Sequence, residues 1–455
     1  MAEMTPAMWA EECEERLQRQ RSEVDRLRLY HEGRQPLALQ SKKYASALAE
    51  MIRGVRDNWL PIVVDAVEER LQVEGFRFGE DPGADGDAWS MWQANNLDAD
   101  AALAHETALV TGRCMVLVWP ADPWPEITVE DPSQCVVLYE AGSRRRRLAA
   151  WKQWTDEWTD AEFGTLYLPD RLVRLRKAEG RTMQGDASAT WVLRGDPAGD
   201  ELAHPAGVVP MVELRPRPGM PAKARSEIED VLTTQDQINK LVCDLLVASE
   251  YASFRQRWAT GLEVPEDPET HEPVEPFKAA VDRLWVNPDP EGRFGDFEAT
   301  DLGNIVKAIE NRTQSLASRT RTPPHYLLGG MGTWPSGESL RSAEAGLVAK
   351  VKRRSVHFGE GWEEVERLGF AMKGDDRAQQ TSAETIWADP EYRTEAEHVD
   401  ALVKLRTLDV PKRQLWEDAG YSQEQIARFR AMLLEEAFTQ LETTGTVGGL
   451  PVAGA

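Results

Sequence analysis

Residues 332–339 (GTWPSGES) have the glycine spacing of a phosphate-binding loop. Such a loop needs a lysine after its second glycine and a strand before its first glycine. Here the lysine position holds Glu338, whose carboxylate would repel phosphate, and Pro323 and Pro324 lie where the strand is needed. We therefore interpret the segment as a loop that leads into a helix capped by Ser336.

The sequence contains no other pattern typical of catalysis or metal binding. The seven histidines do not cluster, and neither an HExxH motif nor a CxxC pair occurs. Glu363, Glu364 and Glu366 lie within about one turn of a predicted helix, and such a run is typical of a solvated helix face. We expect no catalytic residues, no metal and no cofactor.

Two basic clusters could contact phosphate groups. Residues 144–147 are four consecutive arginines between two predicted strands, which indicates an exposed hairpin loop that could also touch nucleic acid or an acidic neighbour. Lys350, Lys352, Arg353 and Arg354 lie on the predicted helix that follows the Gly-rich loop. They form either the solvated face of that helix or a set of weak phosphate contacts, and both interpretations stay open.

The chain as a whole is acidic. Its 455 residues include 77 Asp and Glu against 53 Lys and Arg, a formal net charge of -24. This balance disfavours tight binding of nucleic acid, which depends on Lys and Arg displacing counterions from phosphates. It suits a surface that must not hold DNA tightly.

Length, hydropathy and cysteines narrow the class of protein. The chain exceeds the roughly 250–300 residues of a single core, so several regions are expected. No apolar run of about 18 residues occurs and the N-terminus is charged, so we expect neither a secreted nor a membrane-spanning protein. The cysteines are scattered, which favours a reducing compartment and buried thiols at Cys13, Cys114, Cys135 and Cys243.

The elements of the first half predict an α+β region. Helical periodicity covers residues 9–27, 45–54, 61–71 and 88–111. Alternating or short apolar segments predict strands at residues 73–78, 114–119, 126–129, 135–139, 148–154, 165–168, 171–177 and 190–193. We expect a sheet-rich region packed with the N-terminal helices.

The second half predicts long helices. Apolar stripes run through residues 226–258 and 302–320, and a long helix starts near residue 336, after a loop at 321–335. Residues 261–276 are acidic and rich in proline, so no helix passes through them. The remaining segments are strand-like at 284–286 and 294–297 and helical at 396–405, 412–419 and 422–441.

This order of elements resembles the phage portal family of the siphovirus type. Residues 334–354 (WPSGESLRSAEAGLVAKVKRR) are similar to the Ser-Gly-Glu-Ala-Leu segment that opens the long helix after the portal tunnel loop, with Ser339 in place of the alanine. Residues 226–250 resemble the portal stem helix, and residues 207–214 (GVVPMVEL) resemble the strand that precedes it. The resemblance extends over residues 45–435.

The resemblance implies an elongated α+β portal fold with several regions around an axial channel. On this chain the regions would be a sheet-containing wing (1–225), a helical stem (226–258 and 303–320), a small α/β clip (259–302), a tunnel loop (321–338), a long helix that returns to the wing (339–395), a helical crown (396–441) and a flexible tail (442–455).

The resemblance also implies functional residues. The tunnel loop would act through Tyr326, Leu327, Leu328, Gly329, Gly330, Met331, Gly332 and Trp334. The clip would offer an acidic surface to the terminase motor at Glu263, Glu266, Asp267 and Glu269. The candidate DNA-facing residues are Lys350, Lys352, Arg353 and Arg354.

The implied partners are those of a DNA channel. They are further copies of the chain in a ring of about twelve subunits, double-stranded DNA that passes without sequence specificity, the terminase large subunit, a head-tail adaptor, and the major capsid and scaffolding proteins. The protein would lie at the portal vertex of the virion and be made in the host cytoplasm. Two alternatives stay open: another non-enzymatic virion protein, such as a capsid or adaptor component, and an unrecognised enzyme.

Overall fold

The computed structural model describes residues 4–37, 56–79, 83–178, 190–196, 199–220, 223–253, 257–260, 293–296, 301–328, 337–391, 395–421 and 423–445. The chain divides into two compact units. Unit 1 contains Met1–Gln35, Asn58–Thr233 and Leu316–Ala455, and unit 2 contains Pro36–Asp57 and Thr234–Ser315. The combination of helices and largely antiparallel sheets makes the fold α+β, as the sequence predicts.

A six-stranded antiparallel sheet forms the sheet-rich part of unit 1. Its strands follow the order β4–β5–β6–β7–β8, and β9 also pairs with β7. Strands β4 to β7 pair in the order of the chain, and three to seven residues join each to the next. The strands are β4 (Cys135–Tyr139), β5 (Arg147–Thr155), β6 (Glu162–Tyr167), β7 (Arg171–Lys177), β8 (Trp191–Leu193) and β9 (Glu201–Ala203).

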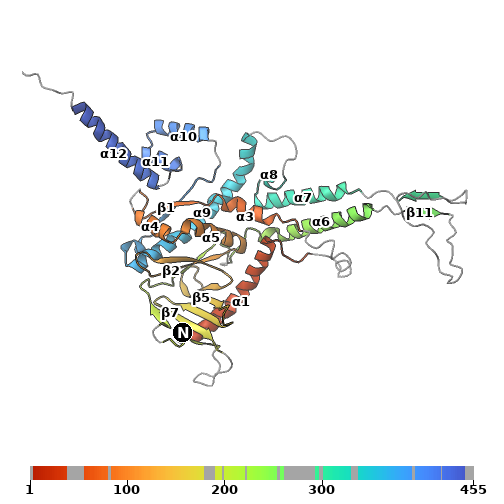
Figure 1. Cartoon of the computed structure of the whole chain (residues 1–455), viewed down its shortest axis with the longest axis horizontal. Coiled ribbons are helices and arrows are strands. Elements are labelled where there is room, and N and C mark those ends of the chain that lie inside the picture. The colour runs from red at the N-terminus through yellow and green to blue at the C-terminus, as the bar shows by residue number, and fades with distance from the viewer. Residues whose placement is uncertain are drawn as a thin grey trace, which may run out of the picture. The chain divides into compact units, whose positions relative to one another are not determined.

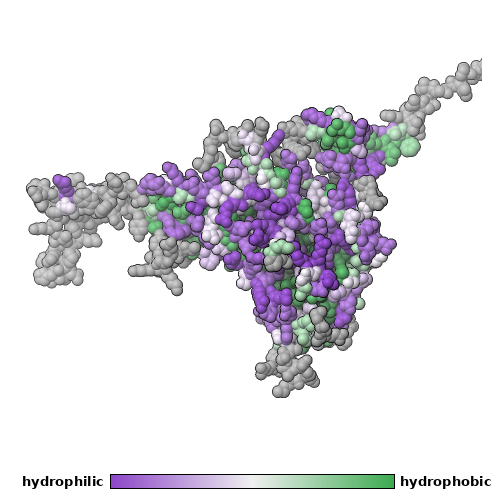
Figure 2. All heavy atoms as spheres, turned by 180° about the vertical axis from the view of Figure 1, so that it is seen from behind, coloured by the Kyte–Doolittle hydropathy of each residue, from purple (hydrophilic) through white to green (hydrophobic). Residues whose placement is uncertain are grey.

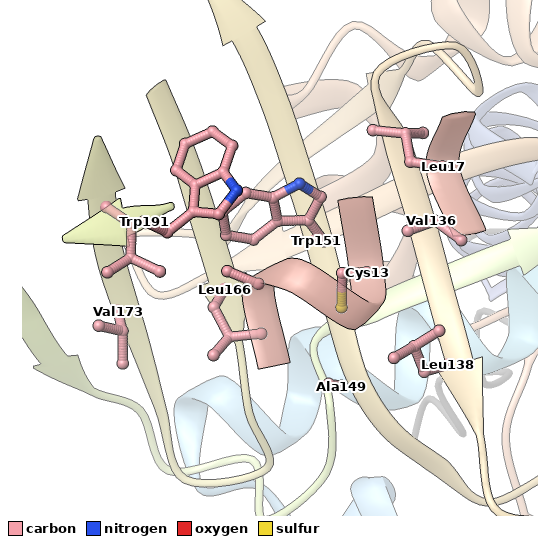
Figure 3. Packing of buried hydrophobic residues seen from close by; sticks show 11 residues of the cluster. Cys13, Leu17, Val136, Leu138, Ala149, Trp151, Leu166, Val173 and Trp191 are labelled. Atoms are coloured by element: carbon pink, nitrogen blue, oxygen red, sulfur yellow. The ribbon is translucent and has the colours of Figure 1, made fainter. Parts of the chain in front are cut away.

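Helix α1 (Pro6–His31) covers one face of this sheet (Figures 1 and 3). Cys13 and Leu17 lie one turn apart on its buried stripe and pack with the two tryptophans Trp151 and Trp191. The two indole rings meet edge to face, with centroids 4.8 Å apart. The apolar periodicity of the N-terminal helix therefore specifies which face of that helix packs on the sheet.

The opposite face of the sheet packs against a second, three-stranded sheet. That sheet has the order β10 (Met211–Leu214), β2 (Cys114–Trp119) and β3 (Glu126–Glu130). Strand β4 serves both layers, because Val136 and Leu138 contribute to the core with α1 while Cys135 and Val137 contribute to the core with β2 and β10. This alternation is the period-two pattern of a strand buried on both faces.

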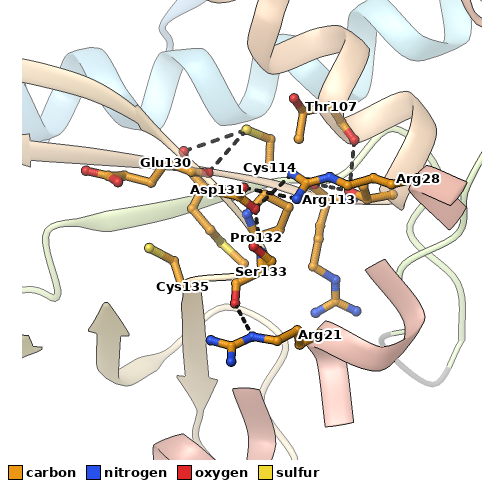
Figure 4. Close-up of polar contacts among 12 residues, drawn as sticks. Arg21, Arg28, Thr107, Arg113, Cys114, Glu130, Asp131, Pro132, Ser133 and Cys135 are labelled. Atoms are coloured by element: carbon orange, nitrogen blue, oxygen red, sulfur yellow. Dashed lines mark hydrogen bonds and ion pairs between the residues drawn. The ribbon is translucent and has the colours of Figure 1, made fainter. Parts of the chain in front are cut away.

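Polar contacts fix α1 to the turn between β3 and β4 (Figure 4). Arg28 donates two hydrogen bonds to the Asp131 carboxylate, at 3.0 and 2.8 Å, and Arg21 donates to the Ser133 carbonyl at 2.8 Å. Burial alone would raise the pKa of Asp131, but the bonds from Arg28 and Ser133 lower it below its ordinary value. The turn is thus held by an ionised carboxylate.

A helical layer lies in the same unit. It contains α3 (Leu60–Glu68), α4 (Gly86–Ala94), α5 (Leu97–Thr111) and α9 (Gly337–Lys373), next to a two-stranded sheet of β1 (Val73–Arg77) and β13 (Glu384–Trp387). The prediction of one helix over residues 88–111 is wrong, because Asn96 has φ 54° and separates α4 from α5. Asparagine adopts this left-handed conformation more readily than most residues.

Unit 2 contains most of α6 (Leu232–Ser253), a two-stranded sheet, and most of α7 (Gly303–Thr320). The sheet pairs β11 (Arg257–Thr260) with β12 (Arg293–Asp296) antiparallel. The prediction that the first helix continues to residue 258 is therefore wrong, since the chain is extended from Arg257. The predicted helix at 45–54, the acidic segment 261–276 and the predicted strand 284–286 lie outside the described residues.

The C-terminal part of unit 1 is helical, as the periodicity predicts. Its helices are α10 (Glu395–Thr407), α11 (Lys412–Asp418) and α12 (Gln423–Gly445). Large apolar side chains there are more than half exposed: Val399, Val403, Leu408, Leu434 and Phe438. Hydrophobic surface also shows over this region in Figure 2. None of the described helices is long and apolar enough to cross a membrane.

Candidate functional site

Helix α9 is the element that carries the candidate DNA-facing cations. The sequence predicts an apolar stripe that also includes Leu340 and Ala343, but Leu340 is only partly buried and Ala343 is exposed. The rest of the predicted stripe is confirmed, because its side chains are fully buried: Leu347, Val351, Phe358, Trp362 and Val365. The stripe packs α9 against β2, β10, β13 and α3. The rotational positions of the four cations on α9 follow from this packing.

Two of those cations form a buried ion cluster with Glu227. Lys350 Nζ lies 3.1 Å from one carboxylate oxygen of Glu227 and donates a 3.0 Å hydrogen bond to the Thr320 carbonyl. Arg354, one turn further along α9, donates from Nε to the other Glu227 oxygen. The side chains of Glu227, Lys350 and Arg354 are 3%, 5% and 10% exposed. The cluster joins the segment before α6, the end of α7 and α9.

Burial and the neighbouring charges shift the pKa values of Glu227 and Lys350. Burial alone would raise the pKa of Glu227, but Lys350 and Arg354 lower it below its ordinary value. Burial lowers the pKa of Lys350, and the attraction of Glu227 offsets only part of that effect. Burial is thus the main reason why the pKa of Lys350 is lowered although it has an acidic partner, and the positive charge of Arg354 lowers it further.

The other two candidate cations, Lys352 and Arg353, are exposed. At about 100° per residue, positions 350 and 354 share one face of the helix, 352 lies on the opposite side, and 353 lies at the edge of the face of 350 and 354. The interpretation as a solvated face therefore fits Lys352 and Arg353 and not Lys350 or Arg354. A DNA-facing role for the four residues stays a prediction.

The N-terminal part of the predicted tunnel loop is held against α9. The short helix α8 (Pro324–Leu327) contains Tyr326, whose hydroxyl accepts a 2.9 Å hydrogen bond from Arg70 and lies 3.2 Å from the Glu344 carboxylate. Leu327 is buried and Leu328 is partly buried. The other loop residues lie outside the described residues: Gly329, Gly330, Met331, Gly332 and Trp334, as does the predicted cap Ser336.

The predicted clip residues Glu263, Glu266, Asp267 and Glu269 also lie outside the described residues. The structure describes the antiparallel pair β11–β12, whose strands flank that segment in the sequence. Docking of a motor at these residues stays a prediction.

The interpretation of Glu363, Glu364 and Glu366 as a solvated helix face is wrong. Glu366 is fully buried, and neither of its carboxylate oxygens has a hydrogen-bond partner among the described residues. Burial raises the pKa of Glu366 well above its ordinary value, and the nearby charge of Asp85 raises it further. Glu364 pairs with Arg147 at 2.6 Å, and Glu363 accepts a 3.1 Å hydrogen bond from the Thr385 amide.

The arginine run 144–147 lies in the turn between β4 and β5, as predicted. Arg144, Arg145 and Arg146 are exposed, whereas Arg147 begins β5 and pairs with Glu364 on α9. Three of the four arginines therefore form an exposed hairpin loop, and the fourth is used within the fold.

No local sequence pattern indicates the polar pair between His105 and Trp362. Both side chains are buried, and the Trp362 indole nitrogen donates a 2.8 Å hydrogen bond to His105 Nε2. Burial lowers the pKa of His105 to about 3, so the ring is neutral and accepts this bond. The role is structural, because the ring is enclosed by Phe358, Trp362 and Trp387.

The described residues contain no group of three or more His, Cys, Asp or Glu side chains that could hold a metal ion. The cysteines are free and buried, as expected from their scatter. Burial raises the pKa of Cys13 to about 12, which makes its thiolate a negligible species near neutral pH.

Comparison with known proteins decides the family. The model of a family described as phage portal protein, SPP1 Gp6-like, matches residues 10–437. The chain belongs to this portal protein family. The match extends over most of the chain, so the resemblance to the portal family is confirmed, while the division into wing, stem, clip and crown stays a prediction.

Two curated relatives are called portal proteins. The portal protein of Mycobacterium phage D29 is 32% identical and that of Mycobacterium phage L5 is 31% identical, each over 405 residues. Each alignment covers 85% of this chain and 80% of the relative.

Two solved structures are also similar. A chain from the virion of a native gene transfer agent particle is 13% identical with a TM-score of 0.43, covering 85% of this chain and 91% of that chain. A chain from the neck of an empty gene transfer agent particle is 10% identical with a TM-score of 0.41, covering 83% and 96%.

Membership in the family gives the portal chain a structural role in a virion, as a subunit of a ring at the capsid vertex. The exposed apolar side chains of α10 and α12 are compatible with such an oligomer, because a neighbouring subunit can cover them.

Proposed function

We propose that the portal subunits form a channel, of about twelve copies, through which double-stranded DNA enters the capsid during packaging and leaves it at ejection. The observation that carries this proposal is the match of the portal family model over residues 10–437. The subunit itself performs no ATP hydrolysis in this proposal. Its phosphate-loop-like segment has Glu338 where a lysine is required.

The charge of the subunit supports passage without tight binding. Each subunit has a formal net charge of -24, so a ring of them repels the DNA backbone over most of its surface. DNA affinity grows with each phosphate that a cation neutralises, and a firmly bound duplex would stall. Exposed cations such as Lys352 and Arg353 are few enough to guide the duplex without holding it.

The tunnel loop is the proposed constriction of the channel. Its N-terminal part is held to α9 through Tyr326 and Glu344, so a loop that begins here has a fixed base. The residues beyond it combine glycines with the apolar side chains of Met331 and Trp334, a composition suited to backbone movement and to contact with neighbouring loops.

Deleting residues 329–333 tests this assignment. Rings should still form, because the deletion removes none of the buried contacts of α8 and α9, whereas packaging or retention of DNA in particles should fall. DNA content is measured in particles assembled with each variant. Normal DNA content in particles with the deletion would refute the constriction.

The partners are proposed from the same role. The acidic clip would dock the terminase large subunit during packaging and the head-tail adaptor afterwards, and the wing and crown would contact the major capsid and scaffolding proteins. Synthesis in the host cytoplasm follows from assembly of the ring before the capsid closes around it. The buried, free cysteines of the described residues fit a reducing compartment.

A further inference from the structure

A cavity of about 560 Å³ lies in unit 1 between the segment before α6, the end of α7 and α9. Seven Lys and Arg side chains line it against two carboxylates, Glu227 and Asp230, which leaves an excess of five positive charges. The chain as a whole has a net charge of -24, so the cavity is a positive region on an acidic protein. It requires a physical explanation, because like charges in one cavity repel each other.

Part of this charge is neutralised inside the subunit. Lys350 and Arg354 share the buried Glu227 carboxylate. Arg217 pairs with Asp230 at 2.9 Å and donates a 2.9 Å hydrogen bond to the Ser226 carbonyl. The contacts of Glu227, Lys350, Arg354 and Arg217 form the floor of the cavity and stabilise its shape.

Three arginines at the cavity are left over. Arg225, Arg321 and Arg353 are exposed, and within the part of the chain that the structure describes no carboxylate lies within ion-pairing distance of them. Arg225 lies in the segment before η1 (Glu229–Val231), Arg321 directly follows α7, and Arg353 is on α9, so the fold and not a local run of sequence brings them to one cavity. Each presents a planar fork of donors that fits two oxygens of a phosphate or carboxylate.

The pKa of His357 reflects the positive electrostatic potential in the cavity. His357 lines the cavity and is partly buried. Burial lowers its pKa, and the charges of Arg354 and Arg353 lower it further. A positive potential acts on this ring, and an anion in the cavity would relieve it.

We propose that this cavity is a binding site for phosphate groups, with Arg225, Arg321 and Arg353 as the residues that contact the oxygens. The source of the phosphate is the backbone of duplex DNA, a part of the inference that rests on the proposed channel function. Contacts of this kind carry no base specificity, which suits a duplex of any sequence. The floor formed by Glu227, Lys350 and Arg354 positions the site without contacting the ligand.

The test uses the purified full-length chain and two probes, inorganic phosphate and a duplex of about 20 base pairs. The variant R321Q/R353Q removes two of the unpaired arginines, both exposed, so folding should be unaffected. The matched control is Lys373→Gln, which removes an exposed cation of the same helix whose side chain does not line this cavity.

Phosphate should raise the melting temperature of the wild type and of the control but not of R321Q/R353Q. Duplex affinity should fall about tenfold in the double variant, and the slope of log affinity against log salt should fall by about 2, one for each lost phosphate contact. The control should stay within about twofold of the wild type in duplex affinity.

Other outcomes are decisive as well. If phosphate stabilises the wild type through these arginines but the duplex does not bind there, the phosphate site stands and its ligand is a free phosphate-bearing molecule. If the double variant changes neither the stabilisation by phosphate nor the affinity for the duplex, the proposal is overturned. If the double variant instead loses ring assembly while phosphate stabilises it as before, the arginines bind a neighbouring subunit, which also overturns the proposal. Ring imaging of the wild type tests the channel function separately.

Discussion

Glu227 and Lys350 are far apart in the sequence, yet their charged groups meet at 3.1 Å in the interior of the subunit. Because Arg354 shares the same carboxylate and Lys350 also donates to the Thr320 carbonyl, this one acidic side chain connects both ends of the predicted stem to the long helix α9. The residues that the sequence marked as a basic surface therefore include part of the internal framework of the portal subunit.

Replacing Glu227 by Gln should destabilise the subunit strongly. The substitution leaves Lys350 and Arg354 buried without a counterion, and such an uncompensated buried charge typically costs about 3–5 kcal/mol. The free energy of unfolding in urea measures the effect.

The matched control is Glu229→Gln. Glu229 pairs with Lys223 at 2.9 Å, but the Lys223 side chain is 55% exposed, so the loss should be below about 1 kcal/mol. Equal stability losses in the two variants would show that the Glu227 cluster has no special role.

Glu366→Gln should change how stability depends on pH. The folded pKa of Glu366 is raised by burial, so this residue favours the folded state fully only below its unfolded pKa, and its contribution is lost as pH rises toward the folded pKa. Glutamine does not titrate. Above roughly pH 4.5, the free energy of unfolding of the variant should therefore increase relative to that of the wild type by about 1 kcal/mol per pH unit. Urea unfolding of both proteins at several values between about pH 5 and pH 8 measures this gain. A difference in unfolding free energy that stays constant with pH would contradict the prediction.

Gly164→Ala should disturb the core beneath α1. A Cβ at Gly164 would lie 2.0 Å from the ring of Trp151, which is fully buried against Trp191 and has no room to move. Overpacking of this kind costs about 1–3 kcal/mol. At Gly86 an added Cβ meets nothing within 4 Å, so Gly86→Ala is the control and should leave the urea midpoint nearly unchanged.

Charge reversal at the clip should weaken motor docking. Lysine at Glu266, Asp267 and Glu269 converts an acidic stretch into a basic one, and mismatched charge slows and weakens association. A pull-down with the terminase large subunit measures docking, and ring assembly should be unaffected.

Reversal at three exposed acidic residues of the sheet region, Glu157, Asp170 and Glu201, supplies the control for total charge. Docking that falls equally in both triple variants would show a general effect of charge and not a clip-specific contact.

Periodicity and composition predicted what depends on neighbours along the chain. The apolar stripe of α9 from Leu347 to Val365 is an example, because helical spacing alone determines which of its residues share a face. Partners distant in sequence were missed. Strand β13 exists because it pairs with β1, and Glu366 is buried because the helical layer packs around that turn of α9. No local pattern distinguishes Glu227 from the other carboxylates around it.

The most direct test of the central claim is electron microscopy of the purified full-length chain. We expect rings of about twelve copies around a central hole that is wide enough for duplex DNA, which is about 20 Å across. Compact particles without a hole, or monomers under all assembly conditions, would contradict the claim that this subunit builds a DNA channel.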